Sequence, residues 1–563
     1  MKNRLLLLTF FIVILLLGFF LRIYQIGGVP ASPDWDEAAL GYNAYSILNT
    51  GRDEYGKFMP VVLQSFDDYK PALYAYLIIP FIPLFGLSMI SVRLPAVLFG
   101  TLSLVVVFFI IRELFNKGIS YNKYAVGRDA IALTVMLLLS ISPWHIQFSR
   151  VAFEAQIGLS FNLFVVLFFL KSFKRNYLLI FSGIFAALSI YVYQSEKVYI
   201  PLLALVLVGS FYKQFLSIPK KWILMSVLIF CVVVFPMGHY VLTNPDALNR
   251  ARGVSVFSDS TRLLEATTKK LERNKNNNDY LGVLIDNRRF EYGRAFVTGY
   301  LSHFEPNWLF YRGDVLRHQP PYMGLLYIFE LPFILVGIYL LIFSSIKRHI
   351  KVFIFGYLLI APLPASVTYD IPHAVRTITM LPIPQVLSAV GLLFVMRKVF
   401  SIQYSVFRIK IKYLLITIFF LLFSINFFYY LNQYFVQMNY YYSQAWQYGW
   451  EEAVPYAQTE AKKFDYVVVS NVSPLDQSYM FFLYYTQYDP KKYQEQGGTK
   501  SGGFARSHTA FENYIFRPIN WEEDKGLKNT LFIGRPEDLP DNIGKTFYYL
   551  NGEPAIVFSG RYE

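Results

Sequence analysis

Long apolar runs separated by short polar segments fill residues 1–431. A helix needs about 20 consecutive apolar residues to cross the hydrocarbon core of a bilayer, and roughly eleven runs reach or approach that length. The runs lie at residues 5–26, 91–111, 130–148, 157–171, 177–194, 199–212, 222–242, 322–343, 352–368, 375–396 and 413–431. This pattern predicts an α-helical membrane protein that crosses the bilayer many times.

A further apolar segment, residues 73–89, is interrupted by Pro80 and Pro83. If it lies along the membrane surface, the Lys and Arg of the short loops fall almost entirely on one side, which the positive-inside rule assigns to the cytoplasm. These are Lys2, Arg4, Arg112, Lys117, Lys123, Arg128, Lys171, Lys174, Arg175, Lys213, Lys220, Lys221, Lys347, Arg348, Lys351, Arg397, Lys398, Arg408, Lys410 and Lys412, against Arg150, Lys197 and Arg376 in the short outside loops. If the segment crossed, this bias would invert from there on. We therefore expect a juxtamembrane helix, a cytoplasmic N-terminus, and outer loops at 27–90 and 243–321.

The tail, residues 432–563, has a different pattern. Short β-rich runs at 466–470, 530–533 and 555–558 read as strands, and residues 478–485 read as a helix. We therefore expect two domains: a transmembrane domain, residues 1–431, and a small extracytoplasmic α/β domain, residues 432–563.

Composition supports this assignment. Apolar residues make up 55% of the chain and charged residues 16%, far from the balance of a soluble protein. The net charge of +14 is explained by the cytoplasmic loops, so nucleic acid is not an expected partner. The single Cys231 lies in an apolar run and gives no disulfide or Cys-based metal site. The first apolar run could instead be a cleaved signal peptide that ends near Val29-Pro30-Ala31, although it is long for a signal peptide.

The candidate chemistry begins at Asp34-Trp35-Asp36-Glu37, just after the first span. Asp34 and Glu37 are spaced as an N-cap and its N3 partner, opening a helix over 35–48 that ends near Gly51. That leaves Asp36 without a required structural role, although the helix dipole favours any acid there. Asp36 is our candidate general base at the outer membrane surface.

Cations near this acid could hold a phosphate. Lys70 begins the juxtamembrane segment, where an ammonium can meet a lipid phosphate. Arg93 lies inside a span, where a charge is costly unless it snorkels or binds an anion. Further polar residues lie at outer ends of spans or in the outer loops: Asp67, Asp68, Arg150, Glu154, His303, His373 and Arg376. The spacing of His303, Asn307 and Asp314 does not indicate a metal site.

Several motifs together resemble a known family. They are Asp36-Glu37-Ala38, residues 51–56 with Pro60, Lys70-Pro71, Arg93-Leu94-Pro95, residues 142–145, Ser149-Arg150 with Glu154, residues 300–304, Gly313-Asp314 and His373 with Arg376-Thr377. The set resembles the dolichyl-phosphate-mannose protein mannosyltransferase-like family, which also contains the aminoarabinose transferases that modify lipid A. The resemblance covers most of the chain to about residue 431.

The resemblance implies a GT-C fold and an inverting glycosyltransferase that uses a polyprenyl-phosphate sugar. It implies catalytic roles for Asp36 and Glu37 and donor-phosphate binding by Lys70, with Arg93 and Arg376 assisting. Asp67, Asp68, Arg150, Glu154, His303 and His373 are expected to contact substrate. The chain lacks the luminal inserts of the family's eukaryotic members, which favours a prokaryotic-type enzyme and counts against a protein acceptor. A lipid, glycan or protein acceptor is expected. A divalent cation such as Mg²⁺ or Mn²⁺ could bridge acids and phosphate, although nothing in the sequence requires one.

Two alternatives remain. A ligase or polymerase of lipid-linked polysaccharide would rely on arginines in a large outer loop, and Arg288, Arg289 and Arg294 are present there. A transporter would fit the polytopic body. It is disfavoured because the spans show no pair of broken segments in matching halves and few ionisable residues lie near mid-bilayer. The sequence identifies neither the sugar nor the acceptor.

Overall fold

The protein is described by a computed structural model covering residues 2–248, 253–257, 260–401, 406–499, 509–540 and 544–561. The chain divides into two compact units. Unit 1 comprises Met1–Gly18, Leu102–His145 and Gly158–Phe427, and unit 2 comprises Phe19–Thr101, Ile146–Ile157 and Phe428–Glu563. The predicted domain boundary at 431/432 lies close to the start of the last segment of unit 2. The first outer loop, however, shares a unit with the tail.

Every predicted apolar run contains a helix. The helices are α1 (Lys2–Ile23), α5 (Met89–Leu114), α6 (Arg128–Ile141), α7 (Pro143–Phe148), α8 (Ala155–Ser172), α9 (Leu178–Ile190), α10 (Glu196–Ser210), α12 (Lys220–Thr243), α17 (Glu330–Phe343), α18 (Arg348–Ile360), α19 (Ile383–Phe400) and α20 (Val406–Asn432). Within the described residues, 6 helices are long and apolar enough to cross a membrane unaided. The chain is therefore a multi-pass membrane protein, and the count of about eleven spans stays a prediction.

Two predicted runs differ from a single continuous helix. The run at 130–148 divides into α6 and α7 because Ser142 precedes Pro143 and takes an extended ψ of 124°. The ring of a proline disfavours helical geometry in the residue before it. In the run at 322–343 the helix begins only at Glu330.

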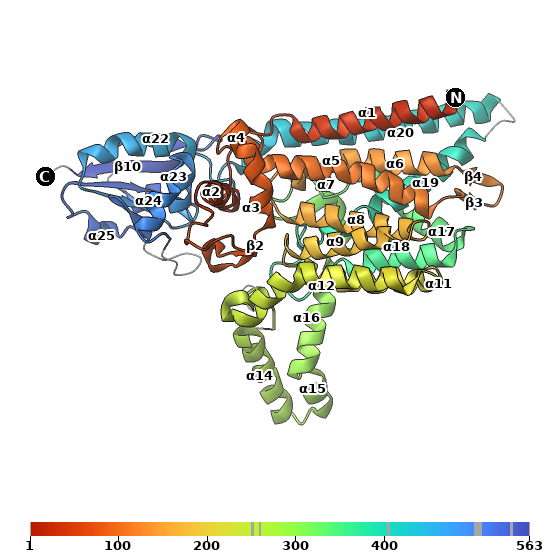
Figure 1. The fold of residues 1–563 in the computed structure, drawn as a ribbon, viewed down its shortest axis with the longest axis horizontal. Helices are drawn as coiled ribbons and strands as arrows, with labels where there is room; N and C mark the ends of the chain where they lie inside the picture. Colours follow the sequence, from red (N-terminus) through yellow and green to blue (C-terminus); the bar gives the residue numbers. More distant parts are fainter. Residues whose placement is uncertain are drawn as a thin grey trace. The chain divides into compact units, whose positions relative to one another are not determined.

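The second outer loop forms an arm of helices in unit 1. It consists of α14 (Ser260–Asn276), α15 (Tyr280–Ile285) and α16 (Arg288–Ser302), which project from the helical bundle of that unit in Figure 1. The side chains of Asp279 and Asn287 accept hydrogen bonds from the first backbone N–H groups of α15 and α16. These caps explain why the short helices start where they do.

The first outer loop is mostly structured. Its main helix is α2 (Trp35–Thr50), followed by the antiparallel pair β1 (Val62–Leu63) and β2 (Lys70–Pro71). The predicted juxtamembrane segment forms α3 (Leu73–Ile78), η2 (Ile79–Phe81) and α4 (Ile82–Phe85), broken where the prolines fall. Its position at the membrane surface stays a prediction.

The tail forms a mixed α/β fold in unit 2. Its described residues contain a 6-stranded sheet of order β6-β7-β5-β8-β10-β9, in which β5 runs parallel to β7 and β8 and the other pairs are antiparallel. The strands are β5 (Tyr466–Val469), β6 (Thr509–Phe511), β7 (Tyr514–Phe516), β8 (Thr530–Gly534), β9 (Thr546–Tyr548) and β10 (Pro554–Arg561), with helices α22 (Trp450–Glu460), α23 (Ser478–Tyr485), α24 (Pro490–Glu495) and α25 (Trp521–Asp524). Val468, Trp521, Phe532, Leu539 and Val557 form a buried apolar cluster. The three predicted strands and the predicted helix are present.

Within unit 2, α2 packs against α23 and α24 of the tail, as Figure 1 shows. Gln447 adds a polar link, since its Oε1 accepts from the backbone N–H of Trp35 at 3.1 Å. Its Nε2 donates to the carbonyls of Pro474 and Asp476, at 3.2 and 2.9 Å. The tail is thus an integral support for the helix that carries the candidate base.

Candidate active site

The start of α2 is built as the sequence predicted. Asp34 is the N-cap, and its Oδ1 accepts from the N–H of Glu37 at 2.9 Å. Gly51 ends the helix with φ +71°, a left-handed conformation that glycine adopts without strain. The carboxylate of Glu37, however, turns away from the cap toward Arg93.

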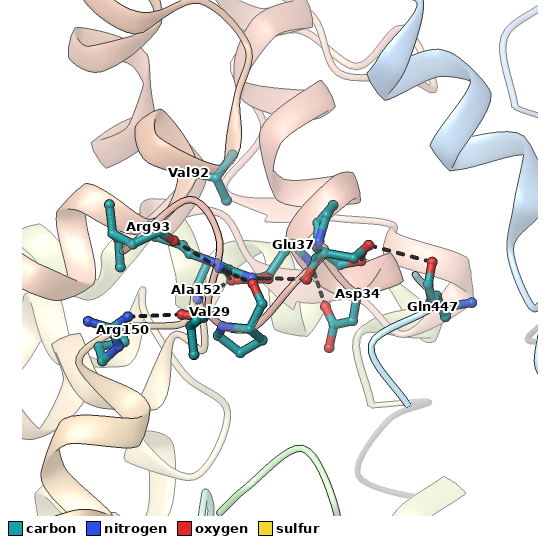
Figure 2. Close-up of polar contacts among 12 residues, drawn as sticks. Val29, Asp34, Glu37, Val92, Arg93, Arg150, Ala152 and Gln447 are labelled. Carbon is teal, nitrogen blue, oxygen red and sulfur yellow. Dashed lines mark hydrogen bonds and ion pairs between the residues drawn. The ribbon is translucent and has the colours of Figure 1, made fainter. Parts of the chain in front are cut away.

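Glu37 and Arg93 form a fully buried ion pair, drawn in Figure 2. Arg93 Nε donates to Glu37 Oε1 at 2.9 Å and Nη2 donates to Oε2 at 2.7 Å, a bidentate geometry that is strong in a dry site. Ala152 N–H donates to Glu37 Oε1 at 2.8 Å. The pair therefore joins α2, α5 and the segment after α7.

The remaining N–H groups of Arg93 are also engaged. Nη1 donates to the carbonyls of Ile26 and Pro30, and Nη2 to that of Ser32, each at 3.0 Å. All five donors of the guanidinium thus have protein acceptors. These contacts favour a positioning role for Arg93 over the predicted phosphate contact.

Arg150 holds the end of the first helix. Its Nη1 donates to the carbonyls of Leu21 and Arg22, and its Nη2 donates to that of Val29 at 3.0 Å. A cation at this position satisfies carbonyls that α1 leaves without a helical partner and complements the helix dipole. Direct substrate contact by Arg150 stays a prediction.

Asp36 and Lys70 form the exposed part of the cluster. Their side chains make an ion pair between α2 and β2, with 22% of the Asp36 side chain and 9% of the Lys70 side chain accessible. By contrast, Asp34 and Glu37 are fully buried. Of the three acids in the predicted motif, Asp36 is therefore the one that an incoming substrate can reach.

Glu154 belongs to the same electrostatic cluster. Burial raises the pKa of Glu154 to about 7, with the charge of Lys70 lowering it and that of Asp36 raising it. Burial alone would lower the pKa of Lys70, but Asp36 and Glu154 outweigh it, so that pKa lies above its ordinary value. The site thus contains a charged lysine beside one acid that is partly neutral near pH 7.

Unit 2 contains another buried acid, Glu54, whose burial could not be read from the sequence. Its Oε2 accepts from the Thr499 hydroxyl at 2.6 Å and the Tyr479 hydroxyl at 3.3 Å, and its Oε1 accepts from Asn43 Nδ2 at 2.9 Å. Burial raises the pKa of Glu54 to about 7, while the hydrogen bonds lower it. Its partners in the tail are distant in sequence, so no local signal could reveal them.

The two acids predicted beside Lys70 are placed only in part. Asp67 ends the short helix η1 (Ser65–Asp67), but its side chain lies outside what the structure describes. The backbone N–H of Asp68 donates to the carbonyl of Ser65 at 2.8 Å, which closes the turn before β2. Substrate contact by either residue stays a prediction.

The remaining predicted residues form a second polar cluster in unit 1. The His303 ring accepts from the N–H of His373 at 3.2 Å, and Asp314 Oδ2 accepts from the N–H of Ala374 at 2.5 Å. Arg376 Nη1 donates to Thr368 Oγ1 and the Tyr369 carbonyl, both at 2.6 Å. Substrate or phosphate contact by His303, His373 and Arg376 stays a prediction. His318 joins this cluster and was not foreseen.

Known proteins share this architecture. Residues 69–239 match the family described as dolichyl-phosphate-mannose-protein mannosyltransferase. The structure is similar to ArnT from Cupriavidus metallidurans in the apo state, with a TM-score of 0.52 and 12% identity over 99% of this chain and 98% of that chain. It is similar to the same protein bound to undecaprenyl phosphate, with a TM-score of 0.50, 12% identity and the same coverage. No curated protein sequence matches the chain.

A third similar structure is the archaeal oligosaccharyltransferase AglB from Archaeoglobus fulgidus, in complex with an inhibitory peptide and a dolichol-phosphate. Its TM-score is 0.51, with 11% identity over 99% of this chain and 74% of that chain. The predicted GT-C fold is thereby confirmed. The family match covers residues 69–239, and the similarity to ArnT and AglB extends the likeness in fold to 99% of the chain.

Proposed function

We propose that this protein is an inverting glycosyltransferase that moves a sugar from a polyprenyl phosphate to an acceptor hydroxyl at the outer membrane surface. The observation that carries the proposal is the Asp36–Lys70 ion pair, which is partly accessible beside a buried polar framework. One carboxylate and one adjacent cation are the groups that this reaction needs most.

In the proposed reaction, Asp36 accepts the proton of the acceptor hydroxyl as its oxygen attacks the anomeric carbon. The bond from that carbon to the phosphate oxygen breaks, and the polyprenyl phosphate leaves with the electron pair. Because attack and departure occur on opposite faces, the anomeric configuration inverts. Lys70 neutralises the leaving phosphate, so no strong acid is needed.

The ion pair suggests how the donor prepares the base. In the structure, the Lys70 ammonium pairs with the Asp36 carboxylate. A phosphate that binds Lys70 competes for this ammonium, which releases Asp36 to accept a proton. Glu37, Arg93 and Arg150 then act as positioning residues that fix α2 and the loop after α1 around the reacting groups.

The similar structures support the donor class. One is bound to undecaprenyl phosphate and another holds a dolichol-phosphate together with a peptide. The outward orientation of the site rests on the distribution of Lys and Arg between the loops. The sugar and the acceptor, whether lipid, glycan or protein, are left open by this proposal.

Replacing Asp36 by Asn tests the proposal. Asn keeps the size of the side chain but cannot accept the proton, so we expect transfer to fall by about 10²–10⁴-fold, the usual contribution of a general base. Purified protein is incubated with synthetic polyprenyl-phosphate sugars and membrane extract, and labelled products are identified by mass spectrometry. The matched control is Glu522→Gln, a change at an exposed side chain of the tail.

Near-normal transfer by Asp36→Asn would remove Asp36 as the base. Absence of sugar release by the parent with several donors would count against the whole proposal. Products extended by many sugar units would instead favour the polysaccharide ligase or polymerase. A correctly inserted variant is recognised by a melting temperature close to that of the parent.

A further inference from the structure

Three metal-ligating side chains converge in unit 1. Asp314 and His318 follow η4 (Trp308–Arg312), and His373 precedes η5 (Ile378–Met380). One ligand atom from each side chain lies within 4.8 Å of the other two. The rings of His318 and His373 are 4.9 Å apart between centroids, at 45°.

The loop that carries Asp314 and His318 is tightly fixed. Gly313 has φ +68°, and a Cβ there would lie 1.3 Å from Gln319 Oε1, so only glycine fits. Gln319 Oε1 accepts from the N–H of Asp314 at 2.5 Å, and its Nε2 donates to the Arg312 carbonyl at 3.0 Å. Asp314 and His318 are thereby held on one side of a closed turn, with His318 Nδ1 at 2.8 Å from Asp314 Oδ2.

The segment that carries His373 is fixed as well. The backbone N–H of His373 donates to the ring of His303. The carbonyl of Ala374 accepts from Trp144 Nε1 at 3.1 Å. Asp314 Oδ2 accepts from the N–H of Ala374. Backbone contacts on both sides therefore hold His373 against the loop that carries the other two ligands.

The donor set fits a borderline-soft divalent ion. Two imidazoles and one carboxylate form the protein ligands of many zinc sites that keep water in the fourth position. A neutral imidazole offers a lone pair on one ring nitrogen, which is the form in which histidine binds a metal. The guanidinium of Arg376 lies on the loop that carries His373, and its positive charge reduces the expected affinity compared with a site that lacks it.

We propose that Asp314, His318 and His373 bind one divalent transition-metal ion of the Zn²⁺ class, with water completing the coordination. The ion ties the loop after η4 to the loop before η5, which also carries Arg376. The proposal does not depend on glycosyl transfer, because the site lies in a different unit from Asp36 and Lys70.

The test uses the full chain in detergent, purified without a metal-affinity tag, stripped with EDTA and titrated with Co²⁺ and Zn²⁺. We expect one ion per chain and intense visible Co²⁺ absorption of a four-coordinate site, reversed by excess Zn²⁺. The affinity is expected to fall at least tenfold in Asp314→Asn, His318→Ala and His373→Ala. His349→Ala, whose ring packs on Phe211 instead, serves as the matched control and should bind like the parent.

A second readout protects the test against a variant that fails to fold. Zn²⁺ should raise the melting temperature of the parent, and EDTA should reverse the shift, because an ion bound only by the folded state stabilises it. A parent that takes up less than a tenth of an ion per chain would overturn the proposal. Equal binding by the parent and all three variants would overturn it too.

Discussion

At the scale of single residues, the four adjacent positions 34–37 have different environments. Asp34 caps a helix, Glu37 is buried against Arg93, and Asp36 is partly accessible beside Lys70. The cap was predictable because it depends on local spacing. The ion pairs depend on partners from other elements, so the sequence alone could not show which acid is buried against an arginine and which is partly accessible.

Arg93 and Lys70 should respond differently to substitution. Arg93→Lys keeps the positive charge but loses the bidentate pair with Glu37 and leaves buried carbonyls unsatisfied, at a cost of about 1–3 kcal/mol for each unsatisfied group. Lys70→Gln leaves Asp36 able to contact water, so its melting temperature should stay near that of the parent while transfer is lost. Melting temperatures test the expected stabilities, and transfer rates over a range of donor concentrations give kcat and the KM for the donor.

A stable Arg93→Lys protein with only a raised KM for the donor would contradict the positioning role. That result would restore the direct phosphate contact predicted from the sequence. A Lys70→Gln protein with normal donor KM and kcat would remove Lys70 from the phosphate site.

Glu154 predicts a pH dependence of stability. Its folded pKa of about 7 lies above its ordinary 4.5, so the folded state holds this proton more tightly than the unfolded state does. Its stabilising contribution is complete below about pH 4.5 and declines as the pH rises to about 7, by on the order of 3 kcal/mol. Glu154→Gln keeps the neutral form, so its melting temperature should match the parent at pH 4.5 and exceed it at pH 8. A pH-independent difference would contradict this assignment.

At the scale of elements, helices and strands that depend on local sequence could be predicted, whereas those that depend on long-range packing could not. Residues 466–470, 478–485 and 530–533 are predicted as strand, helix and strand, since each is a short apolar run in a tail whose loops carry glycine signals. The short strands β6, β7 and β9 have only 3 residues each, too few to show a period. The long apolar runs predicted the positions of the helices in the bundle, but the run at 130–148 forms two helices because Pro143 interrupts it.

At the scale of the whole chain, the first outer loop and the tail form one unit even though 400 or more residues separate many of their contacting partners. The prediction of separate transmembrane and tail domains rested on composition, which reports burial in lipid and says little about which outer segments pack together. The buried Glu54 is the clearest polar link, because it joins Asn43 of α2 to Thr499 and Tyr479 of the tail.

Glu54→Ala should therefore weaken the link between the tail and α2. The change removes the acceptor of the Tyr479 hydroxyl and of one Asn43 amide hydrogen, which costs roughly 1–3 kcal/mol for each unsatisfied group. We expect a lower melting temperature and reduced transfer, because α2 carries Asp36. Glu54→Gln is the matched control, since its amide can accept from Asn43 and donate to Thr499, and it should retain most of both properties. Equal losses in the two variants would indicate that the charge of Glu54 matters more than its hydrogen bonds. Unchanged stability in Glu54→Ala would show that the tail holds α2 by apolar packing alone.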